Sequence, residues 1–362
     1  MGIICNSSNT SKQYKINKKT FSPKKQKPLE STKPNQKSDY IFPEPTTKHM
    51  DISKNYKLSS EIIGKGSSGT VCIGENSTGK YAIKRINKSQ IINLNDIIKE
   101  VKFIDLKHKN IIKYYEVYED LKTISFVMEL GEGGDLFDFI SNSPIGHLPI
   151  YLCIDLIVQI LDVLNYLHNE KGIIHRDLKP ENFMITIDNN NNPIIKLIDF
   201  GFATFKPEKD KMIDEFLGTP QYASPEIIYK LGCNEKCDIW AAGIIFFNMI
   251  TGCEPFKGES INDLYDEIKF KNIDFDYIND DKLRSLIIKM LEREVHKRIN
   301  AKDALDIALK IKEDRDLELK NEILEDNFCG NEMNDVKLVK EKREYEEFWS
   351  NFNNKVCTGF FP

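Results

Sequence analysis

The stretch HRDLKPENFM at 175–184, together with LIDFG at 197–201, decides how this chain folds. The segments around them are rich in β-branched and other apolar residues, which is typical of short strands. Asp177, Lys179 and Asn182 share one short loop, and Asp199 ends the next strand-like segment. This set offers a carboxylate for a hydroxyl group, a cation for transferring phosphate charge, and the oxygen ligands that Mg²⁺ prefers. The pattern therefore predicts a phosphate-transfer site, and a purely structural origin for all four residues is improbable.

A glycine-rich stretch, IGKGSSGTV at 63–71, precedes this loop. Gly64, Gly66 and Gly69 allow the backbone to approach phosphate groups where side chains would clash. The same spacing also occurs in dinucleotide folds, but there a helix begins inside the glycines. Here TVCIGENSTGKYAIKRI continues as strand, turn and strand. The glycines are therefore expected to cap a hairpin that covers a nucleotide.

Lys84 lies in YAIK, among apolar strand residues. Such a lysine points inward or toward a ligand, although a solvated lysine at a sheet edge is the alternative. An acidic partner is expected on the next segment, INLNDIIKEVKFIDL, which has helical spacing. Glu100 is the best candidate, because Val101 and Ile104 place it on the inward side.

The coarse pattern is a small β-rich part followed by a larger helical part, an α+β fold. The segments DLFDFI, YLCIDLIVQILDVLNYLHNE and KCDIWAAGIIFFNMITG predict helices after residue 135. No apolar stretch is expected to be long enough to span a membrane. The run DNNNNP at 188–193 lacks the Gly and the terminal Glu of a calcium-binding loop, and is expected to be a solvated turn.

Charge is distributed unevenly along the chain. Residues 1–50 hold ten Lys and three acids, about +7, so the remainder carries about −12, with 41 Lys and Arg against 53 Asp and Glu. Residues 1–50 are expected to be a disordered basic arm. The acidic body argues against nucleic-acid binding, and the arm favours a membrane surface. Eight scattered Cys and no apolar run for secretion indicate a cytoplasmic protein with reduced thiols.

The motif set resembles that of eukaryotic protein kinases over residues 56–308. The resemblance implies a bilobal fold, with a small lobe over 56–128 and a helical lobe over 132–308. It implies ATP and Mg²⁺, with catalytic roles for Asp177, Lys179, Lys84 and Glu100 and metal ligation by Asn182 and Asp199. The implied nucleotide contacts are Ile63, Gly64, Lys65, Gly66, Ser67, Ser68, Gly69, Thr70, Val71, Ala82, Lys84, Met128, Glu129, Gly131 and Asp135.

Three features depart from the usual pattern. SPE at 224–226 stands where the family has Ala-Pro-Glu. The turn between Val71 and Lys84 is about two residues shorter than is usual in the family. The spacing from Glu100 to His108 is about one residue short. This second departure makes Glu100 the least secure assignment. The resemblance also implies that Glu226 pairs with Arg298, and that Asp238 braces the catalytic loop.

HRDLKPENFM, LGEGGDLFDFI and GTPQYASPE are similar to calmodulin-dependent and calcium-dependent kinases, which implies Ser or Thr acceptors in protein substrates. Asp135 and Glu181 imply a basic preference upstream of the acceptor, made modest by Asn248. The tail at 309–362 is charged, is expected to be partly helical, and has no D-x-[DN]-x-[DN]-G loop, so direct calcium binding is not expected. The alternative function, a kinase-fold scaffold or adaptor, predicts a missing Lys, Asp or metal ligand, and none is missing.

Three further features are candidates for regulation. The loop TFKPEKDKMIDEFLGTP at 204–220 has no hydroxyl between its two threonines. Asp214 or Glu215 is expected to meet Arg176 in place of a phosphate, the alternative being that the acids only keep the loop solvated. Thr219 is expected to face Asp177.

The two ends of the chain complete the hypotheses. Gly2 and Cys5 in MGIICNSS are candidate lipidation sites, supported by the Lys-rich segment 12–37, with an unmodified arm as the alternative. In the tail, Phe348, Trp349 and Phe352 are expected to dock on the body, by packing without regulation.

Overall fold

The structure is a computed structural model that describes residue 41 and residues 47–66, 69–91, 97–98, 101–131, 133–190, 192–207, 212–213, 217–329 and 337–357. Residues 66, 323–329, 337, 353 and 355–357 are described by their backbone alone. Gly2, Cys5, Ser67, Ser68, Glu100, Asp214 and Glu215 lie outside the described residues.

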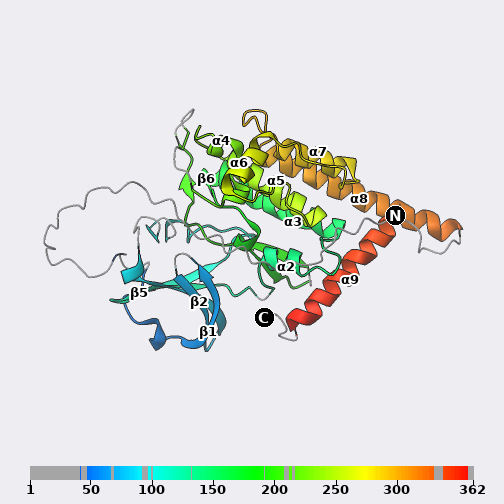
Figure 1. Cartoon of the computed structure of the whole chain (residues 1–362). Coiled ribbons are helices and arrows are strands. Elements are labelled where there is room, and N and C mark those ends of the chain that lie inside the picture. The colour runs from blue at the N-terminus through cyan, green and yellow to red at the C-terminus, as the bar shows by residue number, and fades with distance from the viewer. Residues whose placement is uncertain are drawn as a thin grey trace. The chain divides into compact units, whose positions relative to one another are not determined.

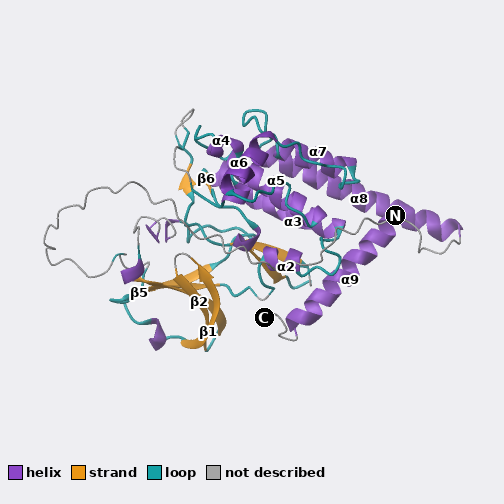
Figure 2. Cartoon of the chain, in the orientation of Figure 1, coloured by secondary structure: helices purple, strands orange, loops and turns teal. Residues whose placement is uncertain are grey.

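An antiparallel sheet in the order β1-β2-β3-β5-β4 forms the small lobe (Figures 1 and 2). The strands are β1 (Lys57–Gly66), β2 (Gly69–Asn76), β3 (Gly79–Asn87), β4 (Tyr114–Glu119) and β5 (Thr123–Met128). The register places Val71 opposite Lys84 and Ala82 opposite Met128. Two 3-10 turns, Ile52–Lys54 and Lys88–Gln90, flank the first three strands. Of the helix expected around Glu100, residues 97–98 and 101–102 are described and are helical.

Residues 47–50, which were expected to belong to a disordered arm, lie against the sheet of the small lobe. Lys48 pairs with β4: its N–H donates to the carbonyl of Val117 at 2.8 Å, and its carbonyl accepts from Glu119 at 3.0 Å. Thr47 is 1% exposed. Polar composition concealed this, because backbone hydrogen bonds to a sheet edge do not depend on the side chains that supply them.

The helical lobe contains α2 (Leu136–Ser141), α3 (Ile150–Asn165), α4 (Pro225–Ile228), α5 (Lys236–Thr251), α6 (Ile261–Phe270), α7 (Asp281–Met290), α8 (Ala301–Cys329) and α9 (Lys337–Cys357). Its short strands are β6 (Ile173–Ile174) with β9 (Thr204–Phe205), and β7 (Phe183–Ile187) with β8 (Pro193–Leu197). Single 3-10 turns occur at Pro180–Asn182 and Pro220–Tyr222. The expected order of strands followed by helices is confirmed.

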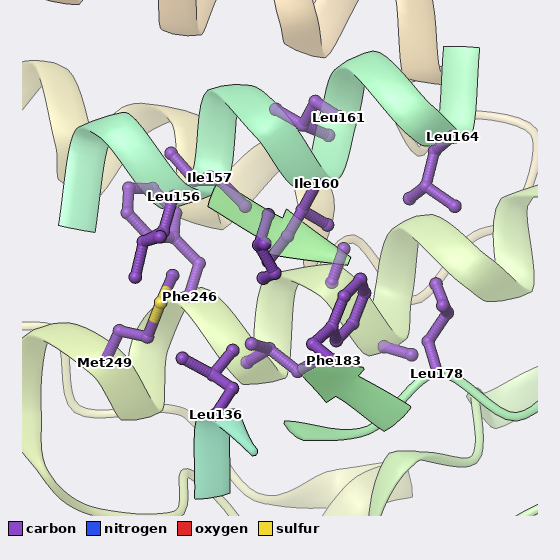
Figure 3. Close-up of a cluster of buried hydrophobic side chains, with 14 of the residues drawn as sticks. Leu136, Leu156, Ile157, Ile160, Leu161, Leu164, Leu178, Phe183, Phe246 and Met249 are labelled. Atoms are coloured by element: carbon purple, nitrogen blue, oxygen red, sulfur yellow. The ribbon is translucent and has the colours of Figure 1, made fainter. Parts of the chain in front are cut away.

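Helices α3 and α5 pack together in one large apolar core (Figure 3). The helix that begins with α3 widens into a π-helical turn at Tyr166–Lys171. The continuous helix Ile150–Lys171 has 22 residues and contains an 18-residue window with a mean hydropathy of 1.7. By length and composition alone it could cross a membrane, so the expectation that no segment would be long enough was wrong. Most of its apolar residues are buried in the core, which accounts for their number.

The predicted boundary at residue 308 falls inside α8, which runs through it without a break. Beyond it, α9 returns along the body and packs against α3 and α8 (Figure 1). Tyr345, Trp349 and Phe352 are each less than a tenth exposed and belong to the main core. The tail aromatic residues therefore dock on the body, as the sequence predicted.

Candidate active site

A cleft of about 490 Å³ is lined by residues from both lobes. Its walls come from the hairpin of β1 and β2, from β3, from the linker after β5, and from the loops around β7 and β8. It brings together most of the residues singled out in the sequence, namely Ile63, Gly64, Lys65, Gly69, Val71, Ala82, Lys84, Met128, Glu129, Gly131, Asp135, Asp177, Lys179, Glu181, Asn182, Asp199 and Thr219. Thr70, on β2 opposite Arg85, is not among the lining residues.

Seven lining residues had no predicted role: Ile112, Tyr114, Leu130, Met184, Ile198, Phe202 and Gly218. They supply mainly apolar surface, which several side-chain types can provide equally well. Met184 and Ile198 lie inside the two quoted motifs, HRDLKPENFM and LIDFG, and that position is the signal that could have found them. Ile112 and Tyr114 come from the segment leading into β4, and only the fold brings them to the cleft.

Lys84 and Asp199 face each other across the cleft. The Lys84 Nζ atom lies 3.9 Å from Asp199 Oδ1. Asp199 has a φ of 63°, a left-handed conformation that is uncommon outside glycine and clusters at functional sites. Burial raises the pKa of Asp199, but the charge of Lys84 and the Gly201 N–H outweigh it and hold the pKa below its ordinary value. The carboxylate is thus ionised, as a cation ligand must be.

The loop before β7 carries a compact polar cluster. The Thr219 hydroxyl donates to Asp177 Oδ1 at 2.8 Å, and Lys179 Nζ lies 3.6 Å from Asp177 Oδ2. Lys179 also donates to the Thr219 hydroxyl at 3.3 Å. Asn182 donates through Nδ2 to the Asp177 carbonyl at 2.7 Å, which commits the amide nitrogen and orients the amide oxygen away from it. A hydroxyl, a cation and a carboxylate therefore meet at one point.

Apolar residues alternate with these polar ones and anchor the loop. Leu178 and Phe183 point into the core between α3 and α5 (Figure 3). They are 1% and 0% exposed. Because they alternate with the polar residues of the loop, their burial holds Asp177 and Asn182 toward the cleft.

Asp238, near the start of α5, braces the same loop from behind. Its carboxylate accepts the backbone N–H groups of His175 and Arg176, each at 2.8 Å, and a ring nitrogen of His168 at 2.8 Å. Burial raises the pKa of Asp238, but the hydrogen bond and charge of His168 outweigh it and lower the pKa. The predicted bracing role is confirmed. It also explains how Arg176 is held at a φ of 69°.

Glu226 and Arg298 form a two-pronged ion pair. Arg298 Nη1 and Nη2 lie 2.7 and 2.8 Å from the two carboxylate oxygens of Glu226. Both side chains are almost completely buried, at 0% and 4% exposed. The pair predicted from sequence is therefore present, and it ties the segment at α4 to the turn that precedes α8.

The linker between the lobes has its own constraints. The Glu129 N–H donates to the Lys113 carbonyl at 2.8 Å, so its own carbonyl is the group that can face a ligand. A Cβ atom on Gly131 would lie 2.8 Å from Met184 Cε, so the close approach of the two segments favours glycine. Asp135 caps α2 by accepting the Asp138 N–H at 2.8 Å, and burial raises the pKa of Asp135.

Comparison with known proteins agrees with this geometry. The family model described as "Protein kinase domain" matches residues 58–308. The chain therefore belongs to the protein kinase family, and the predicted bilobal α+β fold and the predicted class, a protein serine/threonine kinase domain, are confirmed.

The chain is similar to several calcium-dependent protein kinases. Calcium-dependent protein kinase 3 of Plasmodium yoelii yoelii is 36% identical over 259 residues, covering 69% of this chain and 47% of the relative. Calcium-dependent protein kinase 4 of Plasmodium falciparum (isolate 3D7) is 37% identical over 266 residues, covering 70% and 49%. Calcium-dependent protein kinase 7 of Oryza sativa subsp. japonica is 33% identical over 270 residues, covering 71% and 48%. The chain thus spans about half the length of these relatives.

Proposed function

We propose that this protein transfers a phosphoryl group from ATP to Ser or Thr hydroxyls of protein substrates, with Mg²⁺ as the cation. The observation that carries the proposal is the meeting of Asp177, Lys179 and Thr219 in the same cleft as Lys84 and Asp199. The alternative is a kinase-fold scaffold that does not transfer phosphate. The complete polar set argues against it.

The residues of the cleft fit a nucleotide and its cation. Asp199 offers an ionised carboxylate and Asn182 an amide oxygen, which are hard oxygen donors of the kind Mg²⁺ takes. When bound, the cation neutralises phosphate charge. Lys84 would hold the phosphates from the small lobe, the Glu129 carbonyl and the Gly131 N–H would hold the base, and Asp135 would contact the ribose.

Phosphoryl transfer depends on the positioning of the two reactants and on stabilisation of the phosphate charge, with little covalent participation by the protein. Asp177 would accept the substrate hydroxyl's proton at the oxygen that now receives the Thr219 hydroxyl. Lys179, already close to that oxygen pair, would balance charge on the moving phosphoryl group. The substrate hydroxyl would thus take the place that the Thr219 hydroxyl occupies at Asp177.

Asp177→Asn in the purified full chain tests the proposal. We expect Mg²⁺-dependent phosphate transfer from ATP to be lost, with thermal unfolding close to that of the wild type, because Asn keeps the size of the side chain but cannot take the proton. Asp306→Asn, on an exposed position of α8, is the matched control and should keep full activity. Equal activity in wild type and Asp177→Asn would contradict the assignment. Nucleotide binding without any transfer by the wild type would favour the scaffold.

Substrate preference is proposed from two acids of the cleft. Glu181 and Asp135 would attract an Arg or Lys upstream of the acceptor, whereas Asn248 carries no charge to reinforce them. Burial raises the pKa of both carboxyl groups, which lie on the cleft wall. A peptide array should show a modest preference for basic residues upstream, and an equal rate on acidic peptides would overturn it.

Direct regulation by calcium is not proposed, although the relatives bear the name calcium-dependent. Residues 309–362 contain no calcium-binding loop motif, and their mixed charge suits a calmodulin-like partner poorly. Activity of the pure protein should be equal in calcium and in chelator, and a several-fold stimulation by calcium would contradict this.

Membrane attachment is proposed through Gly2, Cys5 and the Lys-rich segment 12–37 on a cytoplasmic membrane surface. One myristoyl chain binds weakly, so a second chain or a basic segment is needed, at about 1 kcal/mol per basic residue near an anionic surface. Fractionation of Gly2→Ala tests the idea, since unchanged membrane association would refute it.

The acids of the loop before Thr219 are proposed to replace an activating phosphate. Asp214 or Glu215 would meet Arg176, more weakly than a phosphate with its nearly two charges. Protein stripped by phosphatase should therefore already be active. Asp214→Asn with Glu215→Gln should lower turnover more than Glu208→Gln with Asp210→Asn, and equal effects would contradict the assignment.

A further inference from the structure

Two buried thiols lie together beneath the segment that follows Asp199. Cys233 precedes α5 and Cys237 lies in its first turn, and they are 1% and 4% exposed. With Ile174 and Ile227 they form a small apolar cluster separate from the main core. The two side chains share this cluster, four positions apart in the chain, where α5 begins. An isolated buried cysteine usually acts only as a small apolar side chain. Two cysteines in one small cluster can in addition react with each other.

The pair connects the two parts of the kinase that must be in place for phosphate transfer. On one side, the backbones of Cys233 and Ile213 exchange two hydrogen bonds of 3.0 Å, and the Ile213 side chain packs against the cluster. Ile213 belongs to the segment between Asp199 and α4. On the other side, the Cys237 Sγ atom lies 3.9 Å from Asp238 Oδ1, the oxygen that accepts the Arg176 N–H. A bond that linked the two sulfurs would therefore act on the catalytic loop through Asp238 and on the neighbouring segment through Ile213.

The two sulfurs differ in their chemistry. The neighbouring Cys237 thiol lowers the pKa of Cys233, burial opposes this, and the nearby charge of Arg176 lowers the pKa further. The neighbouring Cys233 thiol and burial raise the pKa of Cys237. Because the thiolate is the nucleophile, Cys233 is the attacking sulfur and Cys237 the resolving one. A metal site is not supported, since no group of three or more metal-ligating side chains occurs in the described part of the chain.

We propose that Cys233 and Cys237 are a modification site, at which a peroxide drives formation of an intrachain disulfide that lowers kinase activity. The Cys233 thiolate attacks one oxygen of hydrogen peroxide, the O–O bond breaks, and hydroxide leaves, giving a sulfenic acid on Cys233. The Cys237 sulfur then attacks the Cys233 sulfur, the S–O bond breaks, and the thiol proton leaves with the hydroxyl as water. In total, two thiols and one peroxide give one disulfide and two waters.

The disulfide changes geometry because it replaces non-bonded packing of the two side chains by a bond of about 2.05 Å. Closing that gap moves Cys233 toward the first turn of α5, and Ile213 moves with its hydrogen-bonded partner. It also removes the Cys237 thiol proton and shifts the Cys237 sulfur, which lies 3.9 Å from Asp238 Oδ1. Both changes act on the support of the catalytic loop and not on Asp177 itself, so the loss of activity is partial and reversible by a dithiol.

The sequence makes the modification easy to detect. Trypsin cleaves after Lys230 and Lys236, which places Cys233 in the peptide 231–236 and Cys237 at the start of the next one. A disulfide between them is the one link that keeps these two peptides together. The purified full chain is treated with hydrogen peroxide, its remaining thiols are blocked, and the digest is analysed by mass spectrometry with and without dithiol. We expect the linked pair after peroxide and its loss after reduction.

Activity on a peptide substrate is measured in the same samples, and this second readout rests on the proposed kinase function. We expect a several-fold loss of turnover on oxidation, restored by dithiol. Cys233→Ser should keep the turnover of the untreated wild type and resist oxidation, whereas Cys253→Ser, at a cysteine outside the pair, should respond like the wild type. Cys237→Ala serves as a second variant that cannot form the bond.

Three results would overturn the proposal: no linked peptides after peroxide, linked peptides with unchanged turnover, or an equal loss of turnover in Cys233→Ser. An inactive untreated wild type would count against the proposed function alone, because the linked peptides are detected without any kinase activity.

Discussion

Asp238 on α5 and Phe352 on α9 each support a short segment beside the cleft, and they do so by different forces. Asp238 accepts two backbone N–H groups of the catalytic loop through a buried carboxylate. Phe352 lies against Gly133 in the linker between the lobes, where its ring would approach a Cβ to 3.1 Å. The first support is polar and strictly directional. The second is apolar and depends on the fit of a surface.

The comparison shows which kind of support a sequence reveals. A buried carboxylate that satisfies particular N–H groups tolerates few substitutes, because an unsatisfied buried donor is costly. The residue type and its spacing therefore become a motif. An aromatic ring that fills a space beside a linker can be replaced by several side chains, so no motif marks it.

The largest effect is expected from removing the polar support. Asp238→Ala leaves the His175 and Arg176 N–H groups buried without their acceptor, at about 1–3 kcal/mol each. We expect turnover to fall by more than an order of magnitude and the melting temperature to drop clearly, measured by initial rates and thermal unfolding. Asp306→Ala on α8 is the control for loss of an exposed carboxylate. If Asp238→Ala keeps turnover within a factor of two of the wild type, the catalytic loop does not need Asp238 and the contrast between the two supports fails.

The same carboxylate gives a pH dependence with a defined sign. The pKa of Asp238 is lowered in the folded protein, so its stabilising effect is present above the unfolded value of about 3.9 and is lost as the pH falls through the folded value. Asp238→Asn lacks this contribution. The gap in unfolding free energy between wild type and Asp238→Asn should be constant near neutral pH and should narrow below about pH 4. A gap that widens on acidification would contradict the assigned direction.

The polar contacts around the catalytic loop are the part of the site that could be predicted from the sequence. The Asp238 contacts and the Glu226–Arg298 pair were predictable because each needs one residue type at one place in a motif. The cleft residues Ile112 and Tyr114 were not, because their approach to the cleft depends on how the segment before β4 packs against β8. The apolar length of α3 misled the prediction about membrane spans, since the sequence alone does not show that other helices cover it.

The apolar support should give a smaller and more selective effect. Phe352 packs edge-on to Phe139 of α2 at 4.6 Å between ring centroids and stacks on Trp349 at 5.1 Å. The linker it touches carries Gly131 and leads into Asp135, both of which line the cleft. Phe352→Ala should therefore raise the KM for ATP several-fold while changing kcat little, because the catalytic loop keeps its own support. Steady-state kinetics with varied ATP measures both constants.

The control for Phe352→Ala is Phe270→Ala, which removes an aromatic ring that is 70% exposed at the end of α6. It should leave both constants unchanged. If Phe352→Ala lowers kcat and leaves the KM for ATP alone, α9 acts through the catalytic loop and the contrast between the two supports fails. If neither constant changes, the packing of α9 only stabilises the fold.

The smallest effect is expected from the ion pair that attaches α9 to α8 through Glu341. Its removal separates the contribution of charge from that of aromatic packing within the same helix. Arg315 of α8 is 5% exposed. It pairs with Asp280, just before α7, and with Glu341 of α9. Burial raises the pKa of Asp280, but the hydrogen bond from Arg315 outweighs it and lowers the pKa. In Glu341→Gln, Arg315 keeps the ionised Asp280 as its partner, so no buried charge is left alone and the cost stays near 1 kcal/mol. We expect a slightly lower melting temperature and an unchanged KM for ATP, with Lys310→Gln on an exposed ion pair of α8 as the control. A rise in the KM for ATP as large as that of Phe352→Ala would mean that the charged attachment, and not the aromatic packing, sets the position of the linker.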